Sequence, residues 1–427
     1  MAEILIDGYN LGMTKGTGIA TYARNLSKAV TQIGHEVSVL YGQSFADKDD
    51  PLLREISFFD PIDKKPKKVR KALDVAGKAL RSPFVQYPQE LKLTGAVVSD
   101  SFASRLPECA HIYNGEDLFH RSSVGFTIGR GFSRIQLPNT VDLAHWTYPL
   151  PTTVKDAANI YTLHDLVPLK LPYTTLDNKR YYLKLMKEIV QRADHIVTVS
   201  ESSRRDIIEM LGVPEDRITN TYQSVQLPKS ALRYDETEVA RILERGVGVA
   251  YKSYYLFWGS IEPKKNIHRL VEAYLASGVE APLVIVGAQA WKSEDELRLV
   301  REQNAAGKNS IIQLSYAPQD LLIHLIRGAK AALFPSLYEG FGLPALEAMI
   351  LGTPVICSNT ASLPEVVGDA ALTTDPYNSH DIAKAFREMD GDSDLRAELS
   401  KRGIDQAEKF SPEQYRRRLS ELYERLL

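Results

Sequence analysis

The sequence predicts an α/β protein with two doubly wound parallel sheets, one in each half of the chain. Short apolar runs alternate with longer segments of helical periodicity, and this alternation occurs both before and after a polar, charged stretch at residues 227–249. Strands that alternate with helices form parallel sheets whose ligands bind at the carboxyl ends of the strands. We therefore expect a first domain over residues 1–235, a second over 250–410, and a ligand cleft between them.

The first half begins with an apolar run from Glu3 to Asp7, which leads into a glycine-rich loop ending at Gly18. A helix should follow and end at Gly34, because five apolar residues share one helical face. They are Tyr22, Leu26, Ala29, Val30 and Ile33. Further strands are predicted over 37–41, 160–163 and 195–200. Helices follow the last two, and Gly212 ends the second of them.

The second half repeats the pattern more regularly. Strands are predicted at 254–258, 283–286, 311–314, 331–334 and 354–357. The helices between them are predicted at 267–275, 294–303, 320–328 and 344–351. A last amphipathic helix is expected over 411–427, where Ser411 caps the helix and Pro412 begins it.

Composition narrows the class of protein. The chain has 427 residues, of which 44% are hydrophobic and 25% charged, and these values exclude a disordered or fibrous protein. The net charge of −2 gives no reason to expect a nucleic-acid partner. Two distant cysteines, Cys109 and Cys357, exclude a disulfide scaffold. The N-terminus does not resemble a secretory signal and no apolar run is long enough to span a membrane, so we expect a cytoplasmic protein.

The most informative stretch is a glycine-rich loop between a strand and a helix, Pro335-Ser-Leu-Tyr-Glu339-Gly-Phe-Gly-Leu-Pro-Ala-Leu-Glu347. The free amides at the start of a helix, together with its dipole, attract anions. Glycines let the backbone approach a ligand closely. Carboxylates accept hydrogen bonds from sugar hydroxyls, so Glu339 before the loop and Glu347, expected in the first helical turn, suit a sugar nucleotide. The alternative is that Glu347 only complements the helix dipole.

A second candidate site follows the first strand of the second domain, at Gly259-Ser-Ile-Glu-Pro-Lys264-Lys265-Asn266. Two lysines at the start of a helix can hold a phosphate group. The alternative is that the two lysines only lie in solvent at the start of a helix.

These stretches resemble the retaining glycosyltransferases of family 4, which have the GT-B fold. The family hallmark, two glutamates separated by seven residues, corresponds to Glu339 and Glu347. Gly352-Thr-Pro354 and Ser362-Leu-Pro364-Glu365 continue the match, as do His164-Asp165-Leu166, Thr198-Val-Ser200 and the loop from Gly16 to Leu26. The likeness is strong over residues 250–375 and absent over 42–140. Within the family, the chain is most similar to bacterial mannosyltransferases that build lipopolysaccharide or exopolysaccharide.

The resemblance implies a role for each matched residue. The leaving diphosphate would be bound by Lys265 with help from Lys264, which stands where many members have arginine. Glu347 would bind the donor ribose, and His164 would reach the donor sugar from the opposite domain. The remaining implied donor contacts are Gly16, Gly18, Ser260, Tyr316, Glu339, Gly340, Phe341, Gly342 and Leu343. The final helix would cross back onto the first domain.

No metal is expected. Asp47-Lys-Asp49 and Asp390-Gly-Asp392-Ser-Asp394 have the spacing of metal-binding acids. However, the second lacks the glycine and the terminal glutamate of a calcium loop, so we interpret both as solvated acidic turns.

Residues 64–81 are the one charge anomaly, with eight basic side chains and a single acid. Val69, Leu73, Ala76 and Leu80 share one face, so the segment could be a basic amphipathic helix that docks on anionic lipid at the inner face of the plasma membrane. The alternative is a helix that packs this apolar face into the core.

We therefore expect a retaining, metal-independent hexosyltransferase that moves mannose from GDP-mannose onto a lipid-linked saccharide. There are three alternatives. A nucleotide-sugar 2-epimerase of the same architecture would lack the pair Glu339 and Glu347. A dinucleotide oxidoreductase is disfavoured because Thr21 stands where a third glycine belongs. A non-catalytic subunit that binds a nucleotide sugar remains open.

Overall fold

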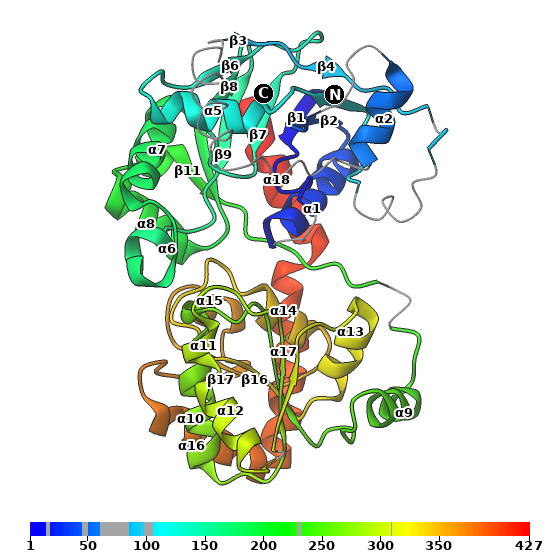
Figure 1. The fold of residues 1–427 in the computed structure, drawn as a ribbon, viewed down its shortest axis with the longest axis vertical. Coiled ribbons are helices and arrows are strands. Elements are labelled where there is room, and N and C mark those ends of the chain that lie inside the picture. Colours follow the sequence, from blue (N-terminus) through cyan, green and yellow to red (C-terminus); the bar gives the residue numbers. More distant parts are fainter. Residues whose placement is uncertain are drawn as a thin grey trace.

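The computed structural model describes residues 1–13, 18–44, 50–59, 85–94, 96–97, 106–228, 232–308 and 310–427. Two α/β domains lie one above the other (Figure 1). Both chain ends lie in the first domain, because the last helix runs back from the second domain to the first. No helix in the part of the chain that is described could cross a bilayer.

The first domain is built on a sheet with strand order β11-β10-β9-β7-β1-β2-β5-β4, in which only the short edge strand β4 pairs antiparallel in the described pairings. Its strands are β1 (Glu3–Asp7), β2 (Glu36–Tyr41), β4 (Gln89–Glu90), β5 (His111–Asn114), β7 (Leu143–Trp146), β9 (Ala158–Thr162), β10 (His195–Thr198) and β11 (Ile218–Asn220). A small parallel sheet comprises β3 (Val85–Gln86), β6 (Ser133–Ile135) and β8 (Thr152–Val154).

Helices cover this sheet in the order that the alternating pattern predicts. They are α1 (Gly18–Gln32), α2 (Pro51–Phe59), α5 (Leu118–Thr127), α6 (Val167–Lys170), α7 (Lys179–Arg192) and α8 (Glu201–Leu211), with short 3-10 turns η1 (Pro172–Thr174) and η2 (Glu215–Arg217). Four of the five residues predicted for the buried face of α1 are fully buried, and Ile33 packs at the edge of the same core. Gly34 and Gly212 follow α1 and α8 with positive φ, which glycine adopts without strain.

The second domain contains a fully parallel sheet with order β14-β13-β12-β15-β16-β17. This is the 3-2-1-4-5-6 order of a dinucleotide-binding sheet, and its chain reversal lies between β12 and β15. The strands are β12 (Tyr255–Trp258), β13 (Leu283–Val286), β14 (Ile311–Leu314), β15 (Ala331–Phe334), β16 (Val355–Ser358) and β17 (Ala371–Thr374). Strands β12, β13, β15 and β16 are buried along their whole length, as expected for strands covered on both faces.

The helices of the second domain lie on both faces of its sheet. They are α9 (Glu236–Gly246), η3 (Pro263–Lys265), α10 (Ile267–Ser277), α11 (Ser293–Glu296), α12 (Arg298–Ala305), α13 (Gln319–Gly328), α14 (Leu343–Ile350), α15 (Leu363–Val367), α16 (Ser379–Gly391), α17 (Ser393–Ala407) and η4 (Glu408–Phe410). The helix predicted over 294–303 is divided into α11 and α12, which meet at Leu297.

The polar segment between the domains contains a helix that the sequence analysis does not predict. Asp235 and Glu238 form a reciprocal capping box at the start of α9, and this helix packs against α13 through the buried side chains of Val239 and Leu243. Its high charge belongs to the solvent face of an amphipathic helix rather than to an extended linker.

The last helix, α18 (Pro412–Leu426), packs against α1 of the first domain. Ser411 caps it by accepting a hydrogen bond from the Gln414 amide. Its buried Tyr423 hydroxyl lies 2.7 Å from Nδ1 of His145, which belongs to the first sheet. The C-terminal helix therefore completes the core of the first domain.

Candidate active site

The loop between β15 and α14 is held by hydroxyl groups of the neighbouring loop and strand. The Ser362 hydroxyl lies 2.8 Å from the Glu339 carbonyl and 2.6 Å from the Phe341 carbonyl. Gly342 has φ of 111°, which a residue with a side chain rarely adopts. We call residues 335–342 the donor loop. The two bonds to Ser362 hold the backbone on either side of Gly340.

Gly340 marks the place where the two domains meet. A Cβ atom here would lie 2.9 Å from Oδ2 of Asp165 and 3.0 Å from the His164 carbonyl oxygen. Both residues follow strand β9 of the first domain. The two stretches that were singled out independently in the sequence are therefore in contact across the domain interface.

Glu339 is bound to Lys265. Lys265 Nζ lies 2.6 Å from Glu339 Oε1, the Ser336 hydroxyl donates to the same oxygen at 2.6 Å, and both charged side chains are largely buried. Burial acts to raise the pKa of Glu339, but the ammonium groups of Lys265 and Lys264 outweigh it and lower the pKa below its ordinary value. Glu339 is therefore a carboxylate at neutral pH.

Lys264 is the second cation beside this carboxylate. Its ammonium lies 3.5 Å from Glu262 Oε1. Burial acts to lower the pKa of Lys264, yet the surrounding carboxylates of Glu262, Asp165 and Glu339 raise it above the usual value. Two lysine side chains therefore lie beyond the carboxyl end of β12, on the turn η3. Such a pair can compensate the charge of a diphosphate.

Glu347 lies on α14, in its second turn rather than the first turn that the sequence analysis expects, because the helix begins at Leu343. The Trp258 indole N–H donates to its Oε2 at 3.1 Å. Burial raises the pKa of Glu347 to about 7. This carboxyl is too far along the helix to complement the dipole of the first turn. A partly buried acid with one protein donor is suited to accept a hydrogen bond from a ligand.

His164 lies just after β9, and its backbone carbonyl approaches the donor loop at Gly340. Its Nε2 is 3.0 Å from the Thr147 carbonyl oxygen, and because a carbonyl only accepts, Nε2 holds the ring proton. Burial lowers the pKa of His164, so the ring is neutral and Nδ1 is a hydrogen-bond acceptor. Tyr22 of α1 packs edge-on against the ring, with a centroid distance of 4.8 Å. The imidazole is therefore fixed in orientation and in tautomer.

Two family models match the chain. "Glycosyltransferase Family 4" matches residues 99–226, and "Glycosyl transferases group 1" matches residues 248–406. The chain is a glycosyltransferase with a family 4 domain and a group 1 domain.

Curated relatives of this glycosyltransferase include several mannosyltransferases. O-antigen chain mannosyltransferase B of Escherichia coli is 37% identical over 260 residues, which cover 59% of this chain and 66% of that protein. Serotype-specific mannosyltransferase WbdA of Escherichia coli is 29% identical over 62% of this chain, a stretch that spans only 33% of WbdA. The MMP alpha-(1->4)-mannosyltransferase of Mycolicibacterium hassiacum is 24% identical over 89% of this chain and 87% of its own length.

Solved structures show that this glycosyltransferase has the GT-B fold. Sucrose-phosphate synthase of Thermosynechococcus elongatus aligns over 100% of this chain and 99% of its own, with a TM-score of 0.67 and 15% identity. Anabaena HepE in complex with UDP aligns over 99% of this chain and 100% of its own, with a TM-score of 0.65 and 15% identity. The expected architecture is confirmed.

The other residues predicted to contact the donor are exposed, buried away from the loop surface, or outside the described part of the chain. Gly18 begins α1, with open space where a side chain would be, and Ser260 is exposed at the end of β12. Tyr316 follows β14 with its side chain 78% exposed. The Phe341 side chain is buried against Phe410, so only its backbone is available to a ligand. Gly16 lies outside the described residues, as does the whole segment 64–81.

Sequence reasoning gave no role to two positions that shape the site. The Asn266 amide donates to the carbonyl oxygens of Pro335, at 3.0 Å, and Pro376, at 2.7 Å, so it fastens η3 to the donor loop. A Cβ atom at Gly287 would lie 1.8 Å from the Gly259 carbonyl oxygen. In the sequence, Asn266 is distinguished only by its place directly after the two lysines. Gly287 indicates only the end of a strand.

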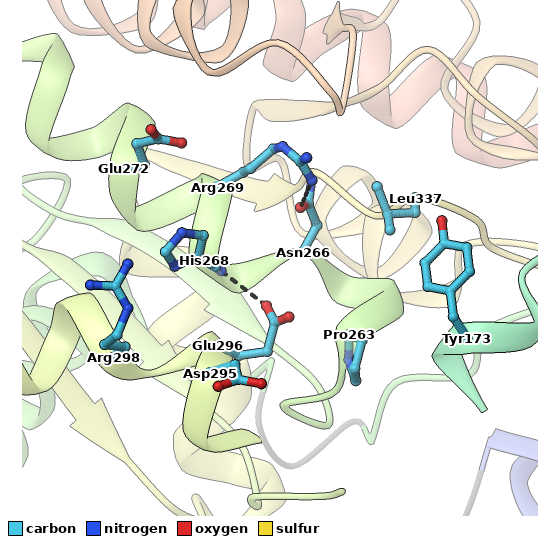
Figure 2. Close-up of a pocket in the computed structure, with 10 residues that line it drawn as sticks. All are labelled: Tyr173, Pro263, Asn266, His268, Arg269, Glu272, Asp295, Glu296, Arg298 and Leu337. Carbon is cyan, nitrogen blue, oxygen red and sulfur yellow. Dashed lines mark hydrogen bonds between the residues drawn. The ribbon is translucent and has the colours of Figure 1, made fainter. Parts of the chain in front are cut away.

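A hollow of about 450 Å³ lies beside η3, between Tyr173 of the first domain and the second domain (Figure 2). The residues that line it are Tyr173, Pro263, Asn266, His268, Arg269, Glu272, Asp295, Glu296, Arg298 and Leu337. Several of its polar groups already have protein partners: Glu296 accepts from the His268 amide at 3.0 Å, and Arg269 donates to Asn266 at 3.1 Å. None of the predicted donor contacts is among these residues, so we do not assign the diphosphate to this hollow.

The second acidic stretch proves to be structural. Asp390 pairs with Lys330 at 2.7 Å and accepts from the Tyr255 hydroxyl at 3.1 Å, so it is an ion-paired residue of α16 and not the solvated turn expected. Asp392 caps α17 by accepting from the Leu395 amide. Asp47 and Asp49 lie outside the described residues. Within the ranges that the structure describes, no group of three or more acids, histidines or cysteines could hold a metal.

Proposed function

We propose that this chain transfers mannose from GDP-mannose, with retention of configuration, onto a lipid-linked saccharide of cell-surface glycan synthesis. The observation that supports it most is the pairing of Lys265 with Glu339 beside Lys264, one residue before Gly340, where the donor loop meets the His164 backbone. Lysine and carboxylate side chains lie side by side here. The lysines can bind a diphosphate, and the carboxylates can accept hydrogen bonds from sugar hydroxyls.

The chemistry proposed is stabilisation of a leaving group. Cleavage of the bond between the anomeric carbon and the phosphate oxygen leaves negative charge on the diphosphate and positive character on the sugar ring. Lys264, Lys265 and the first amides of α14 are placed to stabilise that negative charge. Positive charge from two lysines makes a metal unnecessary, so we expect activity to persist in EDTA.

Retention is proposed to occur on the front face of the sugar. The acceptor oxygen attacks the anomeric carbon from the side that the diphosphate leaves, and the departing phosphate oxygen takes the acceptor proton. Glu339 and the neutral Nδ1 of His164 orient the donor hydroxyls from opposite domains. In this proposal neither residue forms a covalent intermediate.

The choice of mannose is supported by the relatives, several of which are mannosyltransferases. The choice of base is less constrained, since the related fold of HepE was solved with UDP. The experiment is therefore thermal unfolding in the presence of GDP, UDP, ADP and their sugar conjugates. A ligand that binds only the folded state raises the melting temperature. A selective shift with GDP and GDP-mannose supports the proposal, a selective UDP shift rejects GDP-mannose, and no shift rejects donor binding.

The lipid-linked acceptor suggests that the protein docks on an anionic membrane. Helix α2 supports this, because Leu52, Leu53 and Ile56 are 40–43% exposed on one helix only five residues before the basic segment 64–81. Apolar side chains next to lysines suit a lipid interface. Replacing the three residues with serine should reduce sedimentation with anionic vesicles and leave nucleotide binding unchanged. Equal sedimentation of variant and wild type would contradict the membrane proposal.

A further inference from the structure

Two clusters of the same chemistry occupy different places in this molecule. In each, one aspartate accepts hydrogen bonds from a tyrosine hydroxyl and a lysine ammonium. The first cluster is Lys170, Asp206 and Tyr338, and it joins the two domains. The second is Lys330, Asp390 and Tyr255, and it lies wholly within the second domain.

The first cluster is anchored directly beside Glu339. Tyr338 precedes Glu339 in the donor loop, and its hydroxyl donates to Oδ2 of Asp206 at 2.5 Å. Asp206 belongs to α8 of the first domain, and its Oδ1 accepts from Lys170 at the end of α6. Tyr338 and Asp206 are 7% and 5% exposed, so this contact is almost free of water. Burial, with Asp206 alongside, raises the pKa of Tyr338, which keeps its hydroxyl a donor at neutral pH.

The start of α8 makes further contacts across the same interface. The Ser203 hydroxyl lies 2.9 Å from the His164 carbonyl and 3.2 Å from the Gly340 carbonyl, so it joins the histidine loop to the donor loop. The Glu365 carboxylate of the second domain accepts from the amides of Glu201 and Ser202, both at 2.9 Å. These amides are the unpaired donors of a helix N-terminus. Helix α8 therefore contacts the donor loop over its first two turns.

We propose that Tyr338 and Asp206 are positioning residues for Glu339, which place its carboxylate against the donor sugar only when the two domains are closed. A carboxylate and a hydroxyl 2.5 Å apart and removed from water strongly favour one geometry. When the domains separate, Asp206 regains water and Tyr338 loses its partner. Closure of the domains and the final position of Glu339 are then a single event. The proposal rests on the proposed function in taking Glu339 as a donor-sugar ligand.

The test uses Tyr338→Phe, which removes one oxygen atom and keeps the ring. Lys264, Lys265 and Glu347 are all in the second domain, so we expect the dissociation constant for GDP to change by less than about threefold. We expect kcat for mannose transfer to fall at least about tenfold, with a small change in KM for the donor, because the lost contact acts after binding. Asp206→Asn should have a similar effect, and the double variant should lose no more than the worse single variant.

The matched control is Tyr255→Phe, which removes the same hydrogen bond from the second cluster. It should lower the melting temperature without lowering kcat, because Asp390 does not touch the donor loop. An unchanged kcat in Tyr338→Phe overturns the proposal. An equal loss of kcat in Tyr255→Phe also overturns it, since the effect would then be one of general stability.

A second measurement does not depend on transfer activity. Small-angle X-ray scattering of Tyr338→Phe should show a larger radius of gyration than that of the wild type and of Tyr255→Phe, because the first cluster no longer holds the domains together. Identical radii for all three proteins would contradict the role in closure. If no nucleotide sugar is a donor for the wild type, the proposed function fails, and the scattering result still decides whether this cluster closes the interface.

Discussion

At the scale of single residues, Lys265 is the side chain that we propose binds the diphosphate. Its ammonium lies 2.6 Å from Glu339 Oε1, and the residue ends η3 just before α10, where we propose that a phosphate oxygen approaches. A hydrogen bond to a charged group contributes about 1.5–3 kcal/mol, which corresponds to roughly 10–100-fold in affinity. Lys265→Ala should weaken GDP binding by this factor in calorimetry, while guanosine binding changes little.

The control for this prediction is Lys401→Ala, since Lys401 is an exposed residue of α17 that no predicted contact involves. Its affinity for GDP should equal that of the wild type. Equal losses of affinity for GDP and guanosine in Lys265→Ala would show that the residue stabilises the fold rather than binds the phosphate.

Glu347 makes stability depend on pH. Burial raises its pKa from an ordinary value of 4.5 to about 7, so the folded protein retains a proton that the unfolded chain has lost between these values. The stabilisation of the folded state by this bound proton is complete below pH 4.5. It disappears as pH rises through 7, because folding then buries a charged carboxylate. Glu347→Gln keeps the shape without the charge. Relative to the wild type, it should melt at least roughly 2 °C higher at pH 8 and show a much smaller gain at pH 5.

The comparison variant is Glu413→Gln, at an exposed position of α18. It should shift the melting temperature equally at both pH values. A gain for Glu347→Gln at pH 5 as large as that at pH 8 would show that its carboxylate is not the titrating group.

At the scale of elements, the end of β13 depends on a glycine. A Cβ atom at Gly287 would lie 1.8 Å from the Gly259 carbonyl oxygen, which is closer than any non-bonded contact. Because Gly259 leads into η3, the clash would move the lysine pair as well as the strands. Gly287→Ala should lower the melting temperature by at least roughly 5 °C and weaken GDP binding. Gly391→Ala, which has open space around it, should do neither; if the two variants melt alike, the packing argument is wrong.

Elements with a strong local pattern could be predicted from the sequence, and others could not. The buried face of α1 and the strands of the second sheet follow from periodicity and from β-branched runs. Strands β5 and β7 are four residues each, and both contain histidine, which does not mark a strand. Helix α9 was missed because its few buried residues are outnumbered by charged ones facing water.

At the scale of the whole molecule, the site residues that could be predicted from the sequence are also those that belong to a local pattern. Glu339, Lys265 and Glu347 were predicted because they belong to short local stretches next to strand ends. Tyr338 and Asp206 are 132 residues apart, and no property of either residue alone indicates that they meet. Contacts between the domains depend on the three-dimensional arrangement. The sequence therefore indicated which groups could bind a donor and not what holds them together.

The connection between the C-terminal helix and the first domain gives the last prediction. His145 is fully buried, with Nδ1 2.7 Å from the Tyr423 hydroxyl and Nε2 2.8 Å from the Thr162 hydroxyl. Burial lowers the pKa of His145 to about 3, so the ring is neutral and depends on these two partners. Tyr423→Phe leaves one ring nitrogen without a partner and away from water, which costs about 1–3 kcal/mol.

Loss of this bond should loosen α18 from the first domain, because Tyr423 is the residue through which the helix bonds to the first sheet at β7. We expect a lower melting temperature and faster proteolytic cleavage near residue 411 in Tyr423→Phe than in Tyr87→Phe, whose hydroxyl group belongs to an exposed side chain. If both variants are cleaved at the wild-type rate, α18 is held by its apolar face and by its other polar contacts, such as the 2.9 Å bond from Arg425 to the Thr219 hydroxyl. The bond between Tyr423 and His145 would then not be what holds the last helix on the domain that contains His164.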